Sequence, residues 1–354
     1  MTDKKLPNQW PTAVDLFSGS GAVTAALKRR HFRVVAAVDN DPVACKTFRL
    51  NHPSTRMIER NVRAVDLAEI RRKDLRGKDL DLLVVCAPCQ PFSSQNRKRG
   101  RDLRSRLILE AGRFARVLKP RLIFFENVPG LASPRYVKLL ARLRRELGAD
   151  YVLGDAEQLD AADFGVPQRR VRCIMLAARR KEPPSLPAPT TPRGARVTVR
   201  ATIGKLRKLV SGEADPDDSL HVARDHRPIA LKRLASIPKN GGSRSSIPRR
   251  LQLVCHRPLD PRNFSDVYGR MAWDDVAPTL TTGCADVTRG RFAHPEENRA
   301  VTLREAALLQ SFPPKYRFMG TSREIQTQIG NAVPARLIDA LVPTFRAGIA
   351  GSRT

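Results

Sequence analysis

The stretch APCQPFS at residues 87–93 holds the residue type best suited to covalent chemistry, a cysteine just beyond an apolar run. Cys86 closes the run DLLVVC and is predicted to pack as a small hydrophobe, whereas Cys89 lies three residues further on. Six of the ten residues 97–106 are Arg or Lys, and such a cationic surround lowers the pKa of a thiol. Cys89 is therefore the candidate nucleophile, and the basic segment is a candidate lid that contacts phosphates.

The C-x-x-C spacing of Cys86 and Cys89 is also found in zinc sites and in dithiol redox centres. A zinc site would need a second ligand pair at metal spacing, and the chain has no second C-x-x-C and no H-x-x-H. No metal is therefore predicted. A thioredoxin-like dithiol stays an alternative, although a formal net charge of +29 is not typical of that activity.

Two further motifs carry charged side chains at the ends of apolar runs. In FFENVPG (124–130), Glu126 follows two phenylalanines, and partial desolvation is expected to raise its pKa, as general acid–base catalysis requires. In QRRVR (168–172), strand alternation predicts Arg170 and Arg172 on one face, where two guanidiniums suit an anion or a base edge. A solvated carboxylate and a soluble basic surface are the alternatives.

A glycine-containing loop, FSGSGAVT (17–24), follows the first apolar run. Gly19 and Gly21 let a ligand approach the backbone, and the start of the next helix favours an anionic group. Asp39 lies 20 residues after Gly19, where an acidic side chain binds ribose hydroxyls in nucleotide-binding folds. The dinucleotide-binding fingerprint has a third glycine, which this loop lacks. From these residues alone, a nicotinamide dehydrogenase and an ordinary tight turn both stay as alternatives.

Short apolar runs alternate with helical-period segments over residues 12–180, which predicts an α/β fold with a doubly wound, mostly parallel sheet of the Rossmann-like kind. The expected strands are 12–17, 33–39, 81–86, 121–126 and a pair around 151–159 and 171–178, and the expected helices are 22–30, 41–50, 103–118 and 134–147. Ligands of such sheets bind at the carboxyl ends of the strands, where these motifs lie.

The proline-rich segment 183–194 marks a domain boundary. We expect a catalytic and cofactor-binding domain over 1–182, a smaller irregular domain over 183–275, and a return segment over 276–345 that packs on the first domain. The return segment contains the amphipathic stretches 302–312 and 335–345.

The charge balance of the 354 residues is strongly basic, with 64 Lys and Arg against 35 Asp and Glu. A polyanion is the usual partner of such a chain, with nucleic acid first, although a general basic bias of the source proteome is the alternative. No apolar run approaches the roughly 18 residues that span a bilayer, and the first residues resemble no secretory signal. We expect a cytoplasmic, nucleoid-associated protein without a disulfide framework.

Taken in order, these motifs resemble those of the cytosine-C5 DNA methyltransferase family of prokaryotic type. DLFSGSGAVT is similar to the methyl-donor loop of the family, APCQPFS to its catalytic loop, ENVPG to its glutamate motif and QRRVR to its arginine motif. TLREAALLQSFP and QIGNAVP (328–334) are similar to its two C-terminal motifs. The resemblance runs from residue 13 to about 342, with a gap over about 183–275 where the family keeps its target-recognition domain.

The resemblance implies transfer of a methyl group from S-adenosylmethionine to C5 of a cytosine that is flipped out of duplex DNA. Cys89 would form a covalent bond to C6 and so make C5 nucleophilic. Glu126 would hold the ring nitrogen N3 and the exocyclic amine. Arg172, supported by Arg170, would steady the base at its O2.

The same resemblance assigns the cofactor site. Phe17 would contact the adenine and Asp39 the ribose, while Pro88 and Asn331 would shape the pocket beside the Gly19–Gly21 loop. The family has an Asp on the third strand that accepts from the adenine amine, and here Asn61 stands at that position. An amide carbonyl still accepts a hydrogen bond, but without charge, which would weaken donor binding.

The expected partners are double-stranded DNA and, if the enzyme is not solitary, a restriction endonuclease that acts on the same site. No membrane partner is expected. The protein is expected to be a monomer. Arg244, Arg249 and Arg270 are the candidates for reading the target. An RNA-directed relative is one alternative, against which an aromatic content of 5% counts. A catalytically inactive DNA-binding protein is another. A dehydrogenase leaves APCQPFS and QRRVR unexplained.

Overall fold

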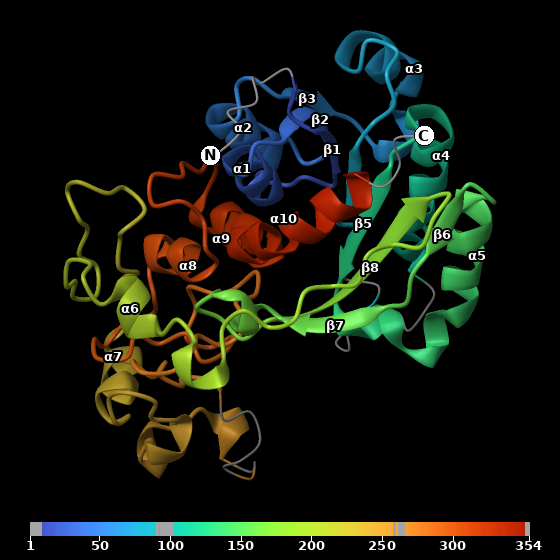
Figure 1. Cartoon of the computed structure of the whole chain (residues 1–354). Helices are drawn as coiled ribbons and strands as arrows, with labels where there is room; N and C mark the ends of the chain where they lie inside the picture. The colour runs from blue at the N-terminus through green and yellow to red at the C-terminus, as the bar shows by residue number, and fades with distance from the viewer. Residues whose placement is uncertain (1–8, 90–91, 93–101, 258–259, 261–265, 351–354) are drawn as a thin grey trace. The chain divides into compact units, whose positions relative to one another are not determined.

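The computed structural model describes residues 9–89, 92, 102–257, 260 and 266–350. The chain divides into two compact units (Figure 1). The first unit comprises residues 1–164, 171–190 and 333–354, and the second comprises 165–170 and 191–332. The chain passes from the first unit to the second after residue 190, residues 276–332 belong to the second unit, and the last helix belongs to the first.

The first unit contains one mixed sheet of eight strands in the order β3-β2-β1-β4-β5-β8-β6, with β7 also paired to β8. The strands are β1 (Thr12–Leu16), β2 (Arg33–Asp39), β3 (Arg56–Glu59), β4 (Leu82–Val85), β5 (Leu122–Asn127), β6 (Tyr151–Leu153), β7 (Glu157–Asp160) and β8 (Val171–Arg179). Strands β1 to β5 are parallel, and β8 runs antiparallel to β5, β6 and β7. The mostly parallel α/β sheet expected from the sequence is confirmed.

Two layers of helices cover the sheet (Figure 1). The helices of this unit are α1 (Ala22–Arg29), α2 (Pro42–Asn51), α3 (Leu67–Glu69), α4 (Glu110–Leu118), α5 (Val137–Leu147) and α10 (Ala335–Ala350). Alternate residues of β5 serve the two layers, as strand geometry requires. Ile123 and Phe125 join the core with α4 and α5, whereas Phe124 packs on Phe345 of α10 with ring centroids 5.1 Å apart.

The second unit is less regular, with α6 (Val199–Ile203), α7 (Pro228–Ala235), α8 (Leu303–Leu309) and α9 (Ser322–Asn331). Buried guanidiniums connect its loops. Arg270 donates to the carbonyl oxygens of Leu234 at 2.8 Å, His294 at 2.9 Å and Glu297 at 2.7 Å. Arg299 forms a two-pronged ion pair with Glu305 of α8, with both distances 2.8 Å. In the described part of this unit, where pairing is limited to isolated bridges, such charged hydrogen bonds hold the loops together.

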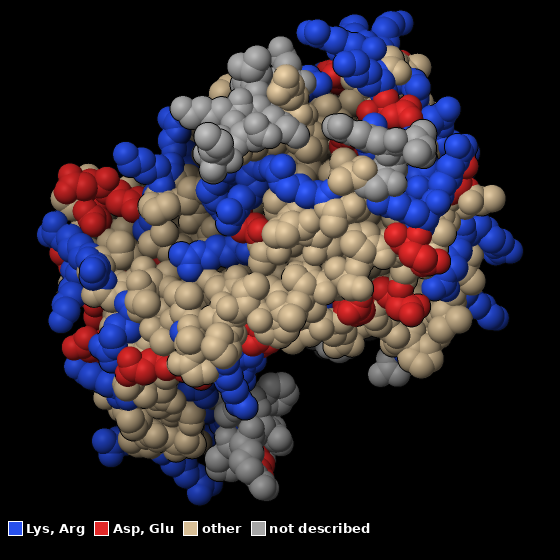
Figure 2. Space-filling model, viewed as in Figure 1, with Lys and Arg blue, Asp and Glu red and all other residues tan. Residues whose placement is uncertain are grey.

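The basic excess is spread over the surface. Figure 2 shows Lys and Arg side chains over this face of both units, with one group over α3 and the π-helical turn Ile70–Asp74 that follows it. Within the described part of the chain, no helix is both long and apolar enough to cross a bilayer.

Candidate active site

The predicted site residues of the first unit lie at the carboxyl ends of its parallel strands, where doubly wound sheets bind their ligands. The glycine loop follows β1, Asp39 ends β2, and Cys89 follows β4 by four residues. Glu126 lies near the end of β5. Because neighbouring parallel strands end at one edge, the fold brings these groups together.

The loop after β1 has a left-handed backbone at three positions, Phe17 (φ 58°), Gly19 (φ 51°) and Gly21 (φ 94°). A Cβ at Gly21 would lie 2.6 Å from the His52 ring, so only glycine fits there. The N–H of Gly19 donates to Oδ2 of Asp39 at 2.8 Å. This hydrogen bond fixes the position of the loop relative to Asp39, and both are expected to contact the same ligand.

Four of the predicted cofactor residues, from four separate segments, line one hollow of the first unit: Phe17, Asp39, Asn61 and Pro88. Oδ1 of Asn61 accepts the N–H of Arg63 at 3.0 Å, and a carbonyl oxygen has a second lone pair for another donor. An aromatic side chain, a carboxylate and an amide around one hollow are the groups that a purine nucleoside needs. These residue types are the ones expected around the adenosine part of S-adenosylmethionine, and the hollow between them has a volume of about 50 Å³.

Two carboxyl groups near this hollow have raised pKa values. Burial raises the pKa of Asp39, while backbone N–H donors oppose that rise. Burial raises the pKa of Asp15 on β1 to about 7; the Thr24 hydroxyl opposes the shift and the Asp39 charge adds to it. Oδ1 of Asp15 has no hydrogen-bond partner among the described residues. Asp15 is thus a buried acid that the sequence analysis did not single out.

Both cysteines of the C-x-x-C motif are half-buried, and neither is part of a disulfide. Burial raises the pKa of the Cys86 thiol well above its usual value, and the carboxylates of Glu126 and Asp15 add to the shift. Cys86 therefore stays protonated at neutral pH, as expected of a structural residue. All six cysteines are within the described residues, and none of them forms a disulfide. The described residues also contain no cluster of three metal-ligating side chains.

The turn that carries Cys89 is held against the turn that follows Glu126. Nδ2 of Asn127 donates to the Ala87 carbonyl at 3.0 Å, and the Phe92 N–H donates to the Cys89 carbonyl at 2.9 Å. A Cβ at Gly130 would lie 2.0 Å from the Phe92 carbonyl oxygen, so this close packing requires glycine. Asn127 and Gly130 were missed as positioning residues, although both stand in the ENVPG motif.

The basic segment after Cys89 is described only from Asp102 onward, so residues 97–101 of the predicted lid lie outside the described residues. Arg104 belongs to the described part and binds Asp102, with Nη2 to Oδ2 at 2.6 Å. The pKa of Arg104 is raised first by this hydrogen bond and in smaller part by the charge of a Cys89 thiolate.

Glu126 and Arg172 form a buried ion pair. Nε of Arg172 lies 2.8 Å from Oε1 of Glu126, and each side chain is 9% exposed. Nη1 of Arg172 also donates to the Val171 carbonyl at 2.7 Å. Burial and the guanidinium act on the carboxyl in opposite directions, so its expected raised pKa stays a prediction. The ion pair holds Oε1 of Glu126 beside the Arg172 guanidinium.

Arg170 and Asn331 belong to the second unit. The buried Arg170 guanidinium donates to the carbonyls of Leu280 at 2.9 Å, Gly330 at 2.8 Å and Ala332 at 3.1 Å. It therefore fixes the end of α9, where Asn331 is exposed. The sequence predicts that Arg170 and Arg172 share one face of a strand. In the structure β8 begins only at Val171, so Arg170 lies before the strand. Its buried guanidinium needs hydrogen-bond acceptors and finds them in carbonyl oxygens of the second unit.

The comparisons with known proteins agree with this geometry. The model of the family described as C-5 cytosine-specific DNA methylase matches residues 12–345. The chain is 37% identical over 336 residues to the type II methylase M.HgiDII of Herpetosiphon aurantiacus, covering 92% of each chain. It is 32% identical over 358 residues to the type II methyltransferase M.XorII of Xanthomonas oryzae pv. oryzae, covering 94% of this chain and 83% of the other.

Two solved structures share the fold. One is a putative DNA modification methyltransferase encoded within an Escherichia coli prophage, with a TM-score of 0.75 and 21% identity, covering 97% of this chain and 100% of the other. The other is DNMT2 of Spodoptera frugiperda, with a TM-score of 0.61 and 17% identity, covering 95% and 99%. At these identities the likeness concerns the fold alone.

Proposed function

The chain belongs to the C-5 cytosine-specific DNA methylase family and is a DNA (cytosine-5-)-methyltransferase, and from this premise we propose that Cys89 is its nucleophile and the Glu126–Arg172 pair its base-binding group. Membership of the family implies a DNA substrate and the use of S-adenosylmethionine. The relatives named as type II enzymes suggest a restriction–modification context.

Cys89 acts by covalent catalysis. Its thiolate forms a bond from Sγ to C6 of cytosine, and the electron pair of the C5–C6 double bond moves into the ring so that C5 becomes nucleophilic. Bound S-adenosylmethionine supplies the electrophilic methyl group for C5. Removal of the C5 proton by a base then restores the double bond and expels the Cys89 thiolate. Arg104 supports this cycle because its positive charge favours the thiolate at both ends of the reaction.

Glu126 binds the edge of the cytosine that carries N3 and the amine. A carboxylate there accepts from the exocyclic amine and favours protonation of N3, which draws electrons from C6 and helps the thiol addition. Arg172 holds the carboxylate through the 2.8 Å ion pair and can donate to the base carbonyl O2 with its remaining N–H groups. In this role Arg170 is a positioning residue, since its guanidinium fixes loops of the second unit.

The cofactor-binding residues follow from the hollow in the first unit. Phe17 would contact the adenine face, Asp39 would accept from the ribose hydroxyls, and Asn61 would accept from the adenine amine. Pro88 lines the same hollow, and the left-handed backbone at Gly19 and Gly21 lets the donor approach the loop. A contribution of Asn331 to this pocket is part of the proposal and awaits direct test.

The reaction requires the target cytosine outside the base stack, so the substrate is duplex DNA with a flipped base. We propose that the enzyme acts as a monomer inside the cell, and that a restriction endonuclease with the same target accompanies it. A catalytically inactive DNA-binding protein would not need the complete set of Cys89, Glu126 and Arg172.

The observation that carries the proposal is the arrangement in the first unit, where Asn127 and Gly130 hold the Cys89 turn against the strand end that bears Glu126. The test is incubation with labelled donor and DNA that contains 5-fluorocytosine, which cannot lose a proton from C5. The wild-type protein should give a denaturation-resistant complex with DNA, and Cys89→Ser should give none while still binding duplex DNA. Methyl transfer by Cys89→Ser at the wild-type rate would remove the assignment.

A further inference from the structure

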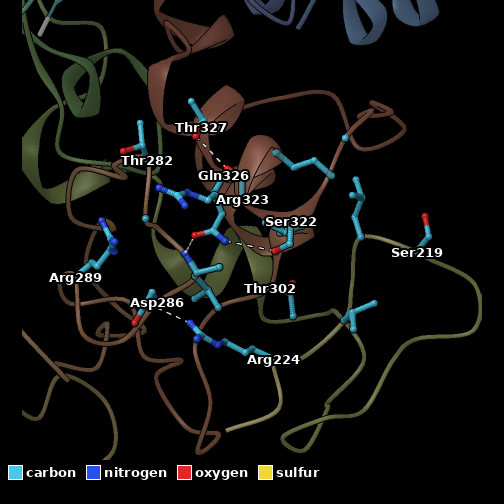
Figure 3. A pocket seen from close by; sticks show the side chains of 18 residues that line it. Ser219, Arg224, Thr282, Asp286, Arg289, Thr302, Ser322, Arg323, Gln326 and Thr327 are labelled. Atoms are coloured by element: carbon cyan, nitrogen blue, oxygen red, sulfur yellow. Dashed lines mark hydrogen bonds and ion pairs between the residues drawn. The ribbon is translucent and has the colours of Figure 1, made fainter. Parts of the chain in front are cut away.

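The second unit contains a hollow of about 770 Å³ that the catalytic proposal does not use. Four segments line it: the coil around Ser219–Arg224, the loop Thr282–Arg289, the start of α8 at 301–303 and the first half of α9 (Figure 3). All of its lining residues belong to the second unit. The hollow is therefore a property of that unit alone and large enough to take the edge of a base pair.

Three arginines, Arg224, Arg289 and Arg323, line this hollow (Figure 3). The guanidiniums of Arg289 and Arg323 are exposed, and among the described residues neither takes part in an ion pair or a side-chain hydrogen bond. The stem of Arg289 lies over Gly283, where an added Cβ would be 2.2 Å from its Cδ. Its position is thus set by packing, while its donors stay available.

The hollow also offers an acceptor and an apolar group. Asp286 pairs with Arg224 at 3.1 Å and accepts from the N–H and hydroxyl of Thr288 at 2.9 and 2.7 Å. Burial would raise the pKa of Asp286, but these hydrogen bonds outweigh it and hold the pKa below its usual value. Asp286 is therefore ionised at neutral pH. Val222, 43% exposed, lies in the same hollow.

This mixture of groups fits base edges better than phosphates. Asp286 is an acceptor even within its ion pair with Arg224, and a site that serves only the DNA phosphates has no use for an acceptor. In the major groove, guanine presents two acceptors, N7 and O6, which match an arginine, and cytosine presents an amine that matches a carboxylate. An apolar side chain such as Val222 suits the methyl group of thymine.

The residues named as base readers from the sequence are mostly not available for that task. Arg270 is buried and used by backbone carbonyls, and Arg244 is buried with Nη2 3.1 Å from the Asp260 carbonyl. The expectation is therefore wrong for these two arginines, whose buried guanidiniums stabilise the loops of the unit. Arg249 is exposed and stays a candidate.

We propose that this hollow reads guanine in the target duplex, with Arg289 and Arg323 donating to N7 and O6 and with Asp286 accepting from the paired cytosine. The proposal rests on the proposed function, since it names the sequence element that the methyltransferase recognises beside its target cytosine. It predicts a target that contains guanines other than the one paired with that cytosine.

The test compares the full-length wild-type protein with Arg289→Met and Arg323→Met. Arg193→Met is the matched control, because Arg193 is also exposed in the second unit but does not line the hollow. The methylated positions of mixed-sequence DNA are mapped first, and kcat/KM is then measured on the mapped duplex, on duplexes with single base-pair changes, and on a duplex with 7-deazaguanine, which lacks N7.

Loss of one such contact should lower kcat/KM on the mapped duplex about 5- to 150-fold. The same variant should no longer discriminate at one guanine position and should be insensitive to 7-deazaguanine there, while Arg193→Met behaves as wild type. Equal losses on every duplex with a weaker salt dependence would indicate phosphate contacts and would overturn the proposal, as would an unchanged target in both variants.

The outcomes also separate this inference from the proposed function. A wild-type protein that methylates cytosine and forms the 5-fluorocytosine complex, with variants that keep its target, overturns only the role of the hollow. A wild-type protein that methylates no DNA at all overturns both.

Discussion

The Glu126–Arg172 ion pair gives the sharpest prediction about the catalytic unit. Replacing Arg172 by methionine keeps much of the side-chain volume but leaves the Glu126 carboxylate buried without its guanidinium partner. Because both side chains are only 9% exposed, solvent cannot replace the lost partner. Breaking a buried pair in this way costs about 3–5 kcal/mol of unfolding free energy.

Arg172→Met should therefore lower the thermal midpoint by roughly 6–20 °C. The loss should be larger at pH 8 than at pH 5, because protonation of Glu126 removes the buried charge that Arg172 offsets in the wild type. Glu126→Gln removes the same charge at its source and should restore most of the midpoint when combined with Arg172→Met. Methyl transfer should not be restored, since the cytosine edge then meets neither a carboxylate nor a guanidinium.

The assay is thermal unfolding of the wild type, both single variants and the double variant at the two pH values, with single-turnover methyl transfer measured on the same samples. Glu126→Gln alone should slow transfer by about 10²- to 10⁴-fold. If the double variant is as unstable as Arg172→Met at pH 8, the unpaired carboxylate is not the cause of the loss. The reasoning from the buried ion pair would then be wrong.

Three further predictions concern the neighbouring residues. Asp15→Asn should stabilise the protein more at pH 8 than at pH 5, by roughly 2–3 kcal/mol, because a folded pKa of about 7 against an ordinary value of 3.8 makes ionisation of Asp15 unfavourable for folding and part of that cost is already present at pH 5; an equal change at both pH values in urea unfolding would contradict this. Cys86→Ala should keep methyl transfer within a fewfold of wild type, and an inactive variant would favour the dithiol alternative. Asn127→Ala should lower kcat more than KM, because it releases the Ala87 carbonyl beside the nucleophile; unchanged single-turnover rates would show that the turn holds without it.

The sequence predicts the catalytic unit well because its signals are local. Buried runs such as 33–39 and 121–126 read as strands, and the motif residues stand directly after them. The sequence does not predict the short strand β3, because RMIE carries charged residues at both ends and is only partly buried. The contacts of Asn127 and Gly130 join segments 40 and 38 residues apart, and no spacing rule predicts such a pairing.

The second unit was predicted poorly for a physical reason. Its loops are held by buried arginines, and a buried structural arginine cannot be told from an exposed DNA-reading arginine by residue type. Arg270 and Arg289 illustrate this, because the first is engaged by carbonyl oxygens and the second has its donors available. The helix α9 was also missed, although Thr321 and Glu324 form a capping box at its start.

The QRRVR motif connects the two roles of the molecule through the chain itself. Arg170 fixes the carbonyls at Leu280 and at the end of α9 in the second unit, and Arg172, two residues later, holds Glu126 in the first. Only Val171 separates the two arginines in sequence, and each of them is held within its own unit, Arg170 by carbonyl oxygens and Arg172 by the Glu126 carboxylate. These separate roles explain why two arginines stand at this spacing, without a base that both of them contact.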